Sequence, residues 1–334
     1  MLPRILKFRR RIQPDRNVAG GDYTMRIRAA LSVLCVTALA AGLVYAAPPG
    51  QIRVQVNLVN IFATVRDKHK AIVTGLKIDD FQVFEDGQAQ EITNFAAESD
   101  LPITLGLLID TSGSEEFMLG IEKEMGSRFL RRVMRKGDLA MVMTFDLDVD
   151  LLADFTDDHS RLDRAINRAQ GNAAAGGVGQ GPVPTSRNNG GTDFYDAVYL
   201  AAHDKLADEA GRKAMVILTD AEDTGSKLKL QDAIEAAQRT DTVVHILLIA
   251  ADGGDQGVAK KLTDETGGRM IVVRNEKNLE QAFDQISEEL RSQYTIGYVP
   301  SNKARDGSYR KIRVDMKNKD YSALARRGYY APTK

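Results

Sequence analysis

Three oxygen-bearing side chains follow directly after an apolar run. Residues 103–109 are too few to span a membrane, and their apolar character is typical of a strand that is buried on both faces. Asp110, Ser112 and Ser114 come next at alternate positions, so their side chains point the same way in an extended loop. One carboxylate and two hydroxyls suit a hard cation such as Mg²⁺, which takes oxygen ligands and retains waters. The pattern therefore predicts a metal site where this strand ends.

The same residues also allow an interpretation without a metal. Ser112 followed by Glu115 has the pattern of a capping box, in which Ser112 would be the N-cap of the next helix. A short Asp-x-Ser-x-Ser pattern also arises by chance in some chains of ordinary composition. Oxygen ligands from other parts of the chain are needed to decide between the two interpretations.

The elements that must position these ligands belong to residues 101–292, in which strand and helix patterns alternate. This alternation predicts an α/β domain with a doubly wound, mostly parallel sheet. Thr192 precedes one of its helices and Asp220 follows one of its strands. Because the carboxyl ends of parallel strands share one edge of a sheet, we expect Asp110, Thr192 and Asp220 at the same edge. Besides 103–109, strands are expected at 139–145, 214–218, 243–249 and 270–273, and the last helix at 278–291.

Other kinds of chemistry find little support in the sequence. Alternating aspartates in residues 146–150 imitate a calcium-binding loop, but Leu151 stands where the sharp turn needs glycine, so a hairpin is predicted instead. The glycine-rich stretch 171–191 has neither the spacing of a dinucleotide fingerprint nor the lysine of a phosphate loop. The four histidines are scattered, and none neighbours a plausible nucleophile in sequence. We therefore predict no catalytic residue and no organic cofactor.

Both flanks of the α/β domain have β character. In residues 51–98, apolar side chains alternate with polar ones and change phase once, which is typical of a bulge or of a strand that passes between two sheets. Within this flank, Glu85-Asp86-Gly87 predicts a tight hairpin turn. Residues 293–334 show the same alternation in two stretches. Neither flank is large enough to bury a core alone, so we expect the two to pair into one accessory β domain.

Residues 1–47 have the features of an export signal. Two arginines precede the apolar stretch 29–43, and a small residue, Ala46, stands before the expected cleavage site. The residues before Met25 make this signal unusually long, so either Met1 or Met25 is the true start, or the segment stays uncleaved as a membrane anchor. We expect an exported protein of the periplasm, cell envelope or extracellular space, with that segment as its only contact with a membrane.

The distribution of charge argues against nucleic acid as a partner. The net charge of the chain is −1, but residues 1–46 hold eight basic and two acidic residues, which leaves 37 basic and 44 acidic residues in the remainder. A net charge of −7 in that remainder does not provide the basic face that a nucleic-acid-binding protein needs. The only cysteine, Cys35, lies inside the predicted export signal, so a cleaved protein would contain no disulfide.

The five oxygen ligands and the phrases around them resemble the von Willebrand factor type A domain. In that family the metal-ion-dependent adhesion site is written Asp-x-Ser-x-Ser, then a Thr, then an Asp, which matches Asp110, Ser112, Ser114, Thr192 and Asp220. The phrases Gly-Thr-Asp-Phe-Tyr-Asp-Ala and Leu-Thr-Asp-Ala-Glu-Asp-Thr resemble the second and third motif segments of the family. The flanks, with Thr74-Gly75-Leu76 and Gly328-Tyr329-Tyr330, resemble exported type A-related proteins that are common in acidobacterial genomes.

The resemblance implies an adhesion-type module that holds Mg²⁺, or another divalent cation such as Mn²⁺ or Ca²⁺. In the family at least one carboxylate reaches the metal through water, so the cation keeps an open position for an Asp or Glu of a protein partner. Asp193 departs from the family, and it either caps the following helix, which we favour, or adds a charge that weakens recognition of anionic ligands. A cell-envelope enzyme that uses the metal catalytically and a structural envelope protein are the alternatives.

Overall fold

The computed structural model describes residues 58–97, 101–113, 118–170, 191–249 and 254–333. All of these belong to one compact unit, Val56–Lys334. The expected export signal, Ser114 and the glycine-rich stretch up to residue 190 lie outside the described residues. None of the helices in the described part combines the length and the apolarity needed to cross a lipid bilayer.

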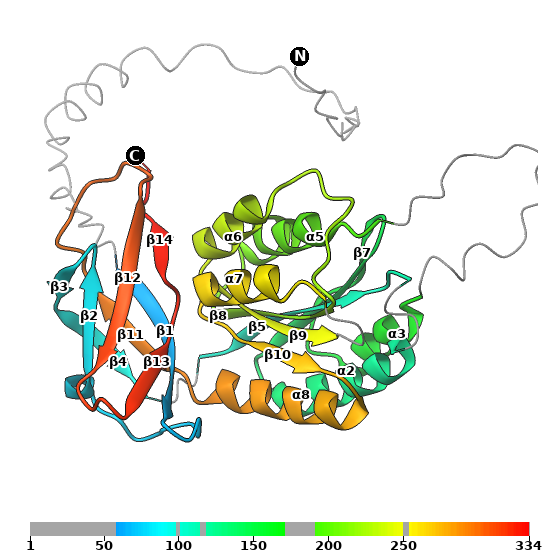
Figure 1. Cartoon of the computed structure of the whole chain (residues 1–334), viewed down its shortest axis with the longest axis horizontal. Helices are drawn as coiled ribbons and strands as arrows, with labels where there is room; N and C mark the ends of the chain where they lie inside the picture. The colour runs from blue at the N-terminus through cyan, green and yellow to red at the C-terminus, as the bar shows by residue number, and fades with distance from the viewer. Residues whose placement is uncertain (1–57, 98–100, 114–117, 171–190, 250–253, 334) are drawn as a thin grey trace, which may run out of the picture. The chain divides into compact units, whose positions relative to one another are not determined.

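A six-stranded sheet forms the centre of the α/β part (Figure 1). Five of its strands are parallel, and the edge strand β7 runs antiparallel to β6. In the order of the sheet the strands are β10 (Met270–Val273), β9 (Thr242–Ile249), β8 (Arg212–Thr219), β5 (Ile103–Asp110), β6 (Leu139–Phe145) and β7 (Val149–Thr156). The predicted α/β class and the predicted hairpin after residue 145 are both confirmed.

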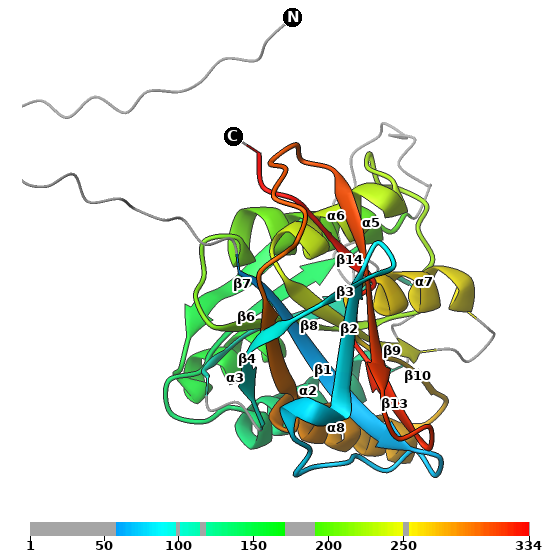
Figure 2. The ribbon, with the colours of Figure 1, turned by 90° about the vertical axis from the view of Figure 1, so that its left-hand side faces the viewer.

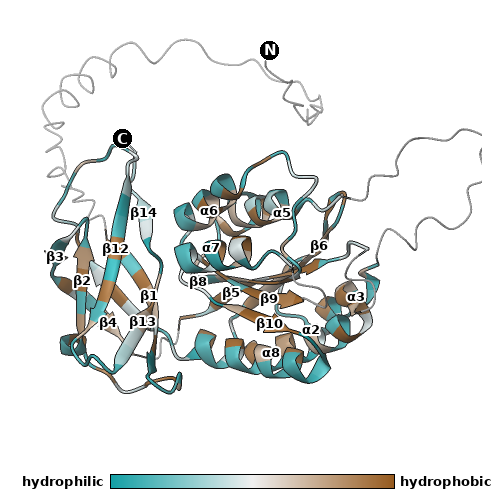
Figure 3. Ribbon diagram, in the orientation of Figure 1, coloured by the Kyte–Doolittle hydropathy of each residue, from teal (hydrophilic) through white to brown (hydrophobic). Residues whose placement is uncertain are grey.

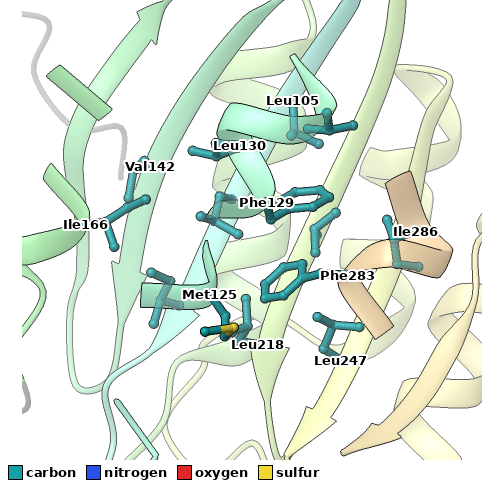
Figure 4. Packing of buried hydrophobic residues seen from close by; sticks show 14 of the residues in the cluster. Leu105, Met125, Phe129, Leu130, Val142, Ile166, Leu218, Leu247, Phe283 and Ile286 are labelled. Carbon is teal, nitrogen blue, oxygen red and sulfur yellow. The ribbon is translucent and has the colours of Figure 1, made fainter. Parts of the chain in front are cut away.

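Helices cover both faces of this sheet because its central strands are apolar on both sides. One face is covered by α2 (Leu119–Val133), α3 (His159–Arg168) and α8 (Glu276–Arg291). The other is covered by α5 (Phe194–Leu200), which continues as a π-helical turn at Ala201–Leu206, and by α6 (Leu230–Arg239) and α7 (Gln256–Thr266). Figure 4 shows the first of these cores, in which Phe129 of α2 stacks on Phe283 of α8 with ring centroids 4.7 Å apart.

The last helix begins two residues earlier than predicted. The sequence pattern places its start at residue 278, whereas α8 begins at Glu276. The reason is local: the side chain of Asn275 accepts a hydrogen bond from the backbone amide of Asn278, so Asn275 is the N-cap.

The flanks form two four-stranded antiparallel sheets, as predicted for the accessory β domain (Figure 2). Strand β1 of the N-terminal flank pairs with β11 and β13 of the C-terminal flank, and β2 pairs with β12. At the tip of the β2–β3 hairpin, Asp86 and Gly87 both have positive φ angles, which is typical of the predicted tight turn. The strands are β1 (Val59–Asp67), β2 (Phe81–Glu85), β3 (Gln88–Gln90), β4 (Ile92–Ala96), β11 (Tyr294–Tyr298), β12 (Tyr309–Met316), β13 (Tyr321–Leu324) and β14 (Gly328–Tyr330), with a 3₁₀ turn at Ile78–Asp80.

Alternating hydropathy explains how the flanks bury a core together (Figure 3). Val59, Ile61, Ala63 and Val65 of β1 are all buried, as their spacing of two residues requires for one face of a strand. They pack with Tyr294, Ile296 and Tyr298 of β11 in a core to which both flanks contribute.

A buried ion-pair cluster joins the β domain to the last helix. The carboxylate of Glu289 on α8 is fully buried and bonds to Arg66 of β1. Its Oε1 also lies 2.6 Å from Nε of Arg269, which directly precedes β10. Burial raises the pKa of Glu289, although both arginines favour its charged form. One helix residue thus connects segments from the β domain and from the sheet.

His245 on β9 makes folding stability depend on pH. The side chain is buried, and neither ring nitrogen has a hydrogen-bond partner among the described residues. Burial and the nearby Arg269 lower the pKa of His245 from 6.5 to about 3. Between these two values the unfolded chain binds a proton that the folded chain does not, so stability is lost as the pH falls through this window.

We expect about 2 kcal/mol of unfolding free energy from this group to be lost between pH 7 and pH 5. Replacing His245 by leucine should remove that part of the pH dependence, because leucine does not titrate. Urea unfolding at both pH values measures it. His203, whose side chain is 59% exposed, is the matched control. If His245→Leu and His203→Leu change the pH dependence equally, the burial argument is wrong.

Candidate metal centre

Asp110 is the last residue of β5, at the carboxyl edge of the sheet, and its side chain is fully buried. Oδ1 accepts a 2.9 Å hydrogen bond from the backbone amide of Ser112. Oδ2 accepts a 2.6 Å hydrogen bond from the hydroxyl of Thr219 at the end of β8. This contact follows from the register, because β5 and β8 are parallel neighbours with Ile109 opposite Leu218. The two strand ends therefore meet as predicted for the carboxyl edge.

The environment of Asp110 suits a cation. Burial, with a smaller contribution from the neighbouring carboxylate of Asp220, raises the pKa of Asp110 from 3.8 to about 6. Hydrogen bonds from Ser112 and Thr219 lower this pKa but do not cancel the effect of burial. These donors are all neutral, so they satisfy oxygen atoms without balancing the charge. A divalent cation would supply that balance, and the donor set of carboxylates and hydroxyls is the kind that Mg²⁺ prefers.

Asp220 follows β8 and is nearly buried. Its Oδ1 accepts a 3.0 Å hydrogen bond from the amide of Glu222, and its backbone carbonyl accepts one of 2.8 Å from Asp255. Gly254 has a φ of +54°, and a Cβ at this position would lie 2.5 Å from the Asp220 carbonyl oxygen. The close approach of residue 254 to Asp220 therefore requires glycine. Together with the hydrogen bond from Asp255, it fixes the backbone of Asp220.

Thr192 reaches the same edge through the loop that follows Asp220. Its amide donates a 3.0 Å hydrogen bond to the hydroxyl of Thr224. Its carbonyl accepts hydrogen bonds of 3.2 Å from the amides of Thr224 and Gly225. The next amide, that of Asp193, bonds to the carbonyl of Asp146 after β6 at 2.7 Å. Thr192 is therefore held between the loops that follow β8 and β6.

The expectation that Asp193 caps α5 is wrong. Asp193 occupies the N-cap position, but its side chain makes no capping hydrogen bond. The first amides of the helix bond instead to the loop after β8: Tyr195 to Asp223 at 3.1 Å and Asp196 to the hydroxyl of Ser226 at 3.1 Å. The carboxylate of Asp193 instead lies against Gly225 of that loop, and burial and nearby acidic residues raise its pKa.

The predicted ligands thus fall into three groups. Asp110 and Ser112 are in direct contact, and Asp220 lies close enough to Asp110 to affect its pKa. Thr192 is bonded to the loop that Asp220 begins, whereas Ser114 and the capping partner Glu115 lie outside the described residues. No group of three or more His, Cys, Asp or Glu side chains in the described ranges is placed to hold a metal; the predicted set has two carboxylates and three hydroxyls.

Sequence reasoning missed two hydroxyls that organise the site. Thr219 bonds to Asp110, and Thr111 donates a 3.0 Å hydrogen bond to Oδ2 of Asp146 after the neighbouring strand β6. Each threonine lies next to a predicted acidic ligand at a strand end. That adjacency was a usable signal for Thr219, but the pairing of Thr111 with Asp146 depends on the order of the strands.

Residues 105–222 match the family model described as the von Willebrand factor type A domain, which confirms the predicted resemblance over this part of the chain. The matched residues include Asp110, Ser112, Ser114, Thr192 and Asp220. No curated protein matches the chain at a significant level.

Several solved structures are similar to this chain at low sequence identity. A von Willebrand factor type A protein from Catenulispora acidiphila is 11% identical, with 84% of this chain and 75% of that chain covered and a TM-score of 0.48. The conserved hypothetical protein BatB from Bacteroides thetaiotaomicron is 16% identical, with 56% and 97% covered and a TM-score of 0.44. The vWF domain of the type V pili tip protein Mfa5 from Porphyromonas gingivalis is 15% identical, with 57% and 96% covered and a TM-score of 0.42.

Proposed function

We propose that this chain, which carries a von Willebrand factor type A domain over residues 105–222, is an exported module that binds a protein ligand through a divalent cation. The cation, Mg²⁺ in the simplest case, would be held by Asp110, Ser112, Ser114, Thr192 and Asp220. An acidic side chain of the ligand would fill its open position. The observation that carries the proposal is the buried carboxylate of Asp110, whose hydrogen-bond donors among the described residues are neutral and which lies beside a second carboxylate.

The chemistry of the ligand set explains why an acidic residue would be recognised. The two carboxylates can do no more than balance the charge of a divalent cation, and the hydroxyls add no negative charge. An ion that is held mainly by neutral oxygens stays electrophilic and attracts a further anionic ligand. The role of the residues is therefore to bind and orient the ion at the sheet edge, and none of them is assigned a catalytic step.

Export forms part of the proposal and is supported by the sequence pattern of residues 1–47. A module that presents a metal site to other proteins fits the periplasm, the cell envelope or the extracellular space. Domains of this type generally serve adhesion or interaction, which agrees with the absence of a catalytic pattern in the sequence.

Selection from a random peptide library on the immobilised full-length protein tests the function. In Mg²⁺ we expect retained peptides to be enriched in Asp or Glu, and EDTA to release them. Thr192→Ala should weaken the affinity of a selected peptide by about tenfold, since water can replace one neutral hydroxyl ligand. Calorimetry with the purified peptide measures this change. Peptides that stay bound in EDTA, or that show no acidic enrichment, would contradict the proposal.

A further inference from the structure

The hairpin between β6 and β7 carries exposed leucines beside the candidate metal centre. Large exposed apolar side chains are few among the described residues, and two of them, Leu147 and Leu151, belong to this one hairpin. Each is 42% exposed. Single exposed leucines are ordinary, so the position of each leucine relative to the metal ligands decides its meaning.

Leu147 lies against the segment that holds Thr192. Its Cδ2 is 3.1 Å from the point that a Cβ at residue 191 would occupy, so the leucine packs directly on Gly191. The hydrogen bond from the Asp193 amide to the Asp146 carbonyl joins the same two segments on the other side of Thr192. The leucine is therefore next to a predicted metal ligand and points partly to solvent.

The tip of the hairpin is also fixed in place. The side chain of Asp146 accepts hydrogen bonds from the hydroxyl of Thr111 at 3.0 Å and from the amide of Asp148 at 3.2 Å. Thr111 immediately follows Asp110, so the tip of the hairpin is tied to the segment after β5 as well as to Gly191. A fixed apolar side chain loses little conformational freedom when a ligand covers it, which favours its use as a contact.

The surroundings of Leu147 are acidic. The carboxylates of Asp148, Asp196 and Asp223 lie near that of Asp193, and Lys227 is the cation that opposes them there. Asp196 and Asp223 are committed to hydrogen bonds that hold the loop after β8. The side chain of Asp193, by contrast, makes no capping hydrogen bond to its helix, and Asp148 lies near it at the tip of the hairpin. A carboxylate ligand that approaches the metal alone would meet repulsion from these two side chains.

We propose that Leu147, Asp148 and Asp193 form a selectivity rim for the metal centre. The rim favours a protein segment whose acidic residue is accompanied by an apolar side chain and a basic one. The apolar side chain covers Leu147, and the basic one meets Asp148 and Asp193. This inference rests on the proposed function, because it concerns the ligand of the same site.

The peptide selection described above tests the rim through the composition of the retained peptides. Wild-type protein should retain peptides with an apolar and a basic residue close to the acidic one. Leu147→Ser should remove the preference for an apolar residue. It should also weaken the affinity of a selected peptide by about tenfold, which is the effect of half-burying one leucine. Leu151→Ser is the matched control, because that leucine is equally exposed on the same hairpin, and it should leave the selection unchanged.

The charges are tested separately with the double variant Asp148→Asn, Asp193→Asn. It should retain peptides that lack basic residues and should lower the salt dependence of binding. Acidic, EDTA-releasable peptides without apolar or basic enrichment would overturn the rim while the proposed function stands. Equal losses of peptide affinity in Leu147→Ser and Leu151→Ser would also overturn the rim. Absence of any acidic, EDTA-releasable peptide would instead contradict the proposed function itself.

Discussion

Replacing Asp110 by asparagine is expected to abolish Mg²⁺-dependent binding while the protein stays folded. Asparagine has the same shape as aspartate: its Oδ1 can accept the hydrogen bond from the Ser112 amide and its Nδ2 can donate one to the Thr219 hydroxyl. It lacks the charge that holds the cation. We expect the affinity for Mg²⁺ to fall by more than about 100-fold, beyond the effect of losing an indirect partner of a metal ligand. The unfolding free energy without metal should not fall, because the substitution removes a buried charge that has neutral hydrogen-bond donors and lies beside the carboxylate of Asp220.

Asp138 provides the matched control for this experiment. It is also a buried aspartate, and it bonds to the amide of Ile103 at the opposite end of β5 and to Arg291. Asp138→Asn should lower the unfolding free energy and leave Mg²⁺ affinity unchanged, the reverse of Asp110→Asn. Calorimetric titration with Mg²⁺ and urea unfolding measure the two quantities. Equal behaviour of the two variants in either measurement would contradict the assignment of Asp110.

Replacing Glu289 by glutamine is expected to destabilise the protein strongly. The carboxylate is fully buried between Arg66 and Arg269, whose side chains are 14% and 22% exposed. Removing one partner of a buried ion pair leaves the other charges without compensation and costs about 3 kcal/mol. Because Arg66 belongs to β1, hydrogen exchange should increase in residues 59–67 as well as in α8.

Asp284 is the control on the same helix, because its ion pair with Arg132 is exposed. Asp284→Asn should change the unfolding free energy by less than about 1 kcal/mol, as is usual for surface pairs. If the two variants have similar unfolding free energies, the buried cluster does not hold the β domain to the last helix.

The sequence was sufficient to predict features that depend on neighbouring residues. The apolar run before Asp110, the alternation in residues 59–65 and the turn at Asp86 and Gly87 each predicted an element that the structure contains. The class of fold follows from such elements in their order along the chain, because alternating strands and helices have few ways to pack.

Contacts between residues far apart in the chain could not be predicted in the same way. Arg66 and Glu289 are separated by 223 positions, and nothing near either residue indicates the other. The side chain of Asp193 illustrates the same limit. Its position favoured a cap, but Asp223 and Ser226, which bond to the helix amides, come from a distant loop. Which side-chain acceptor reaches the amides at the start of a helix depends on tertiary packing, which local preference does not contain.

Binding of a single divalent cation by the full-length protein tests the central claim most directly. Isothermal titration with Mg²⁺ after treatment with EDTA should show one site per chain in the wild type. The same titration of Asp110→Asn and of Asp220→Asn should show no binding at the same concentrations, with both variants folded by circular dichroism. A wild-type protein that binds no divalent cation, or folded variants that bind it as well as the wild type does, would contradict the account.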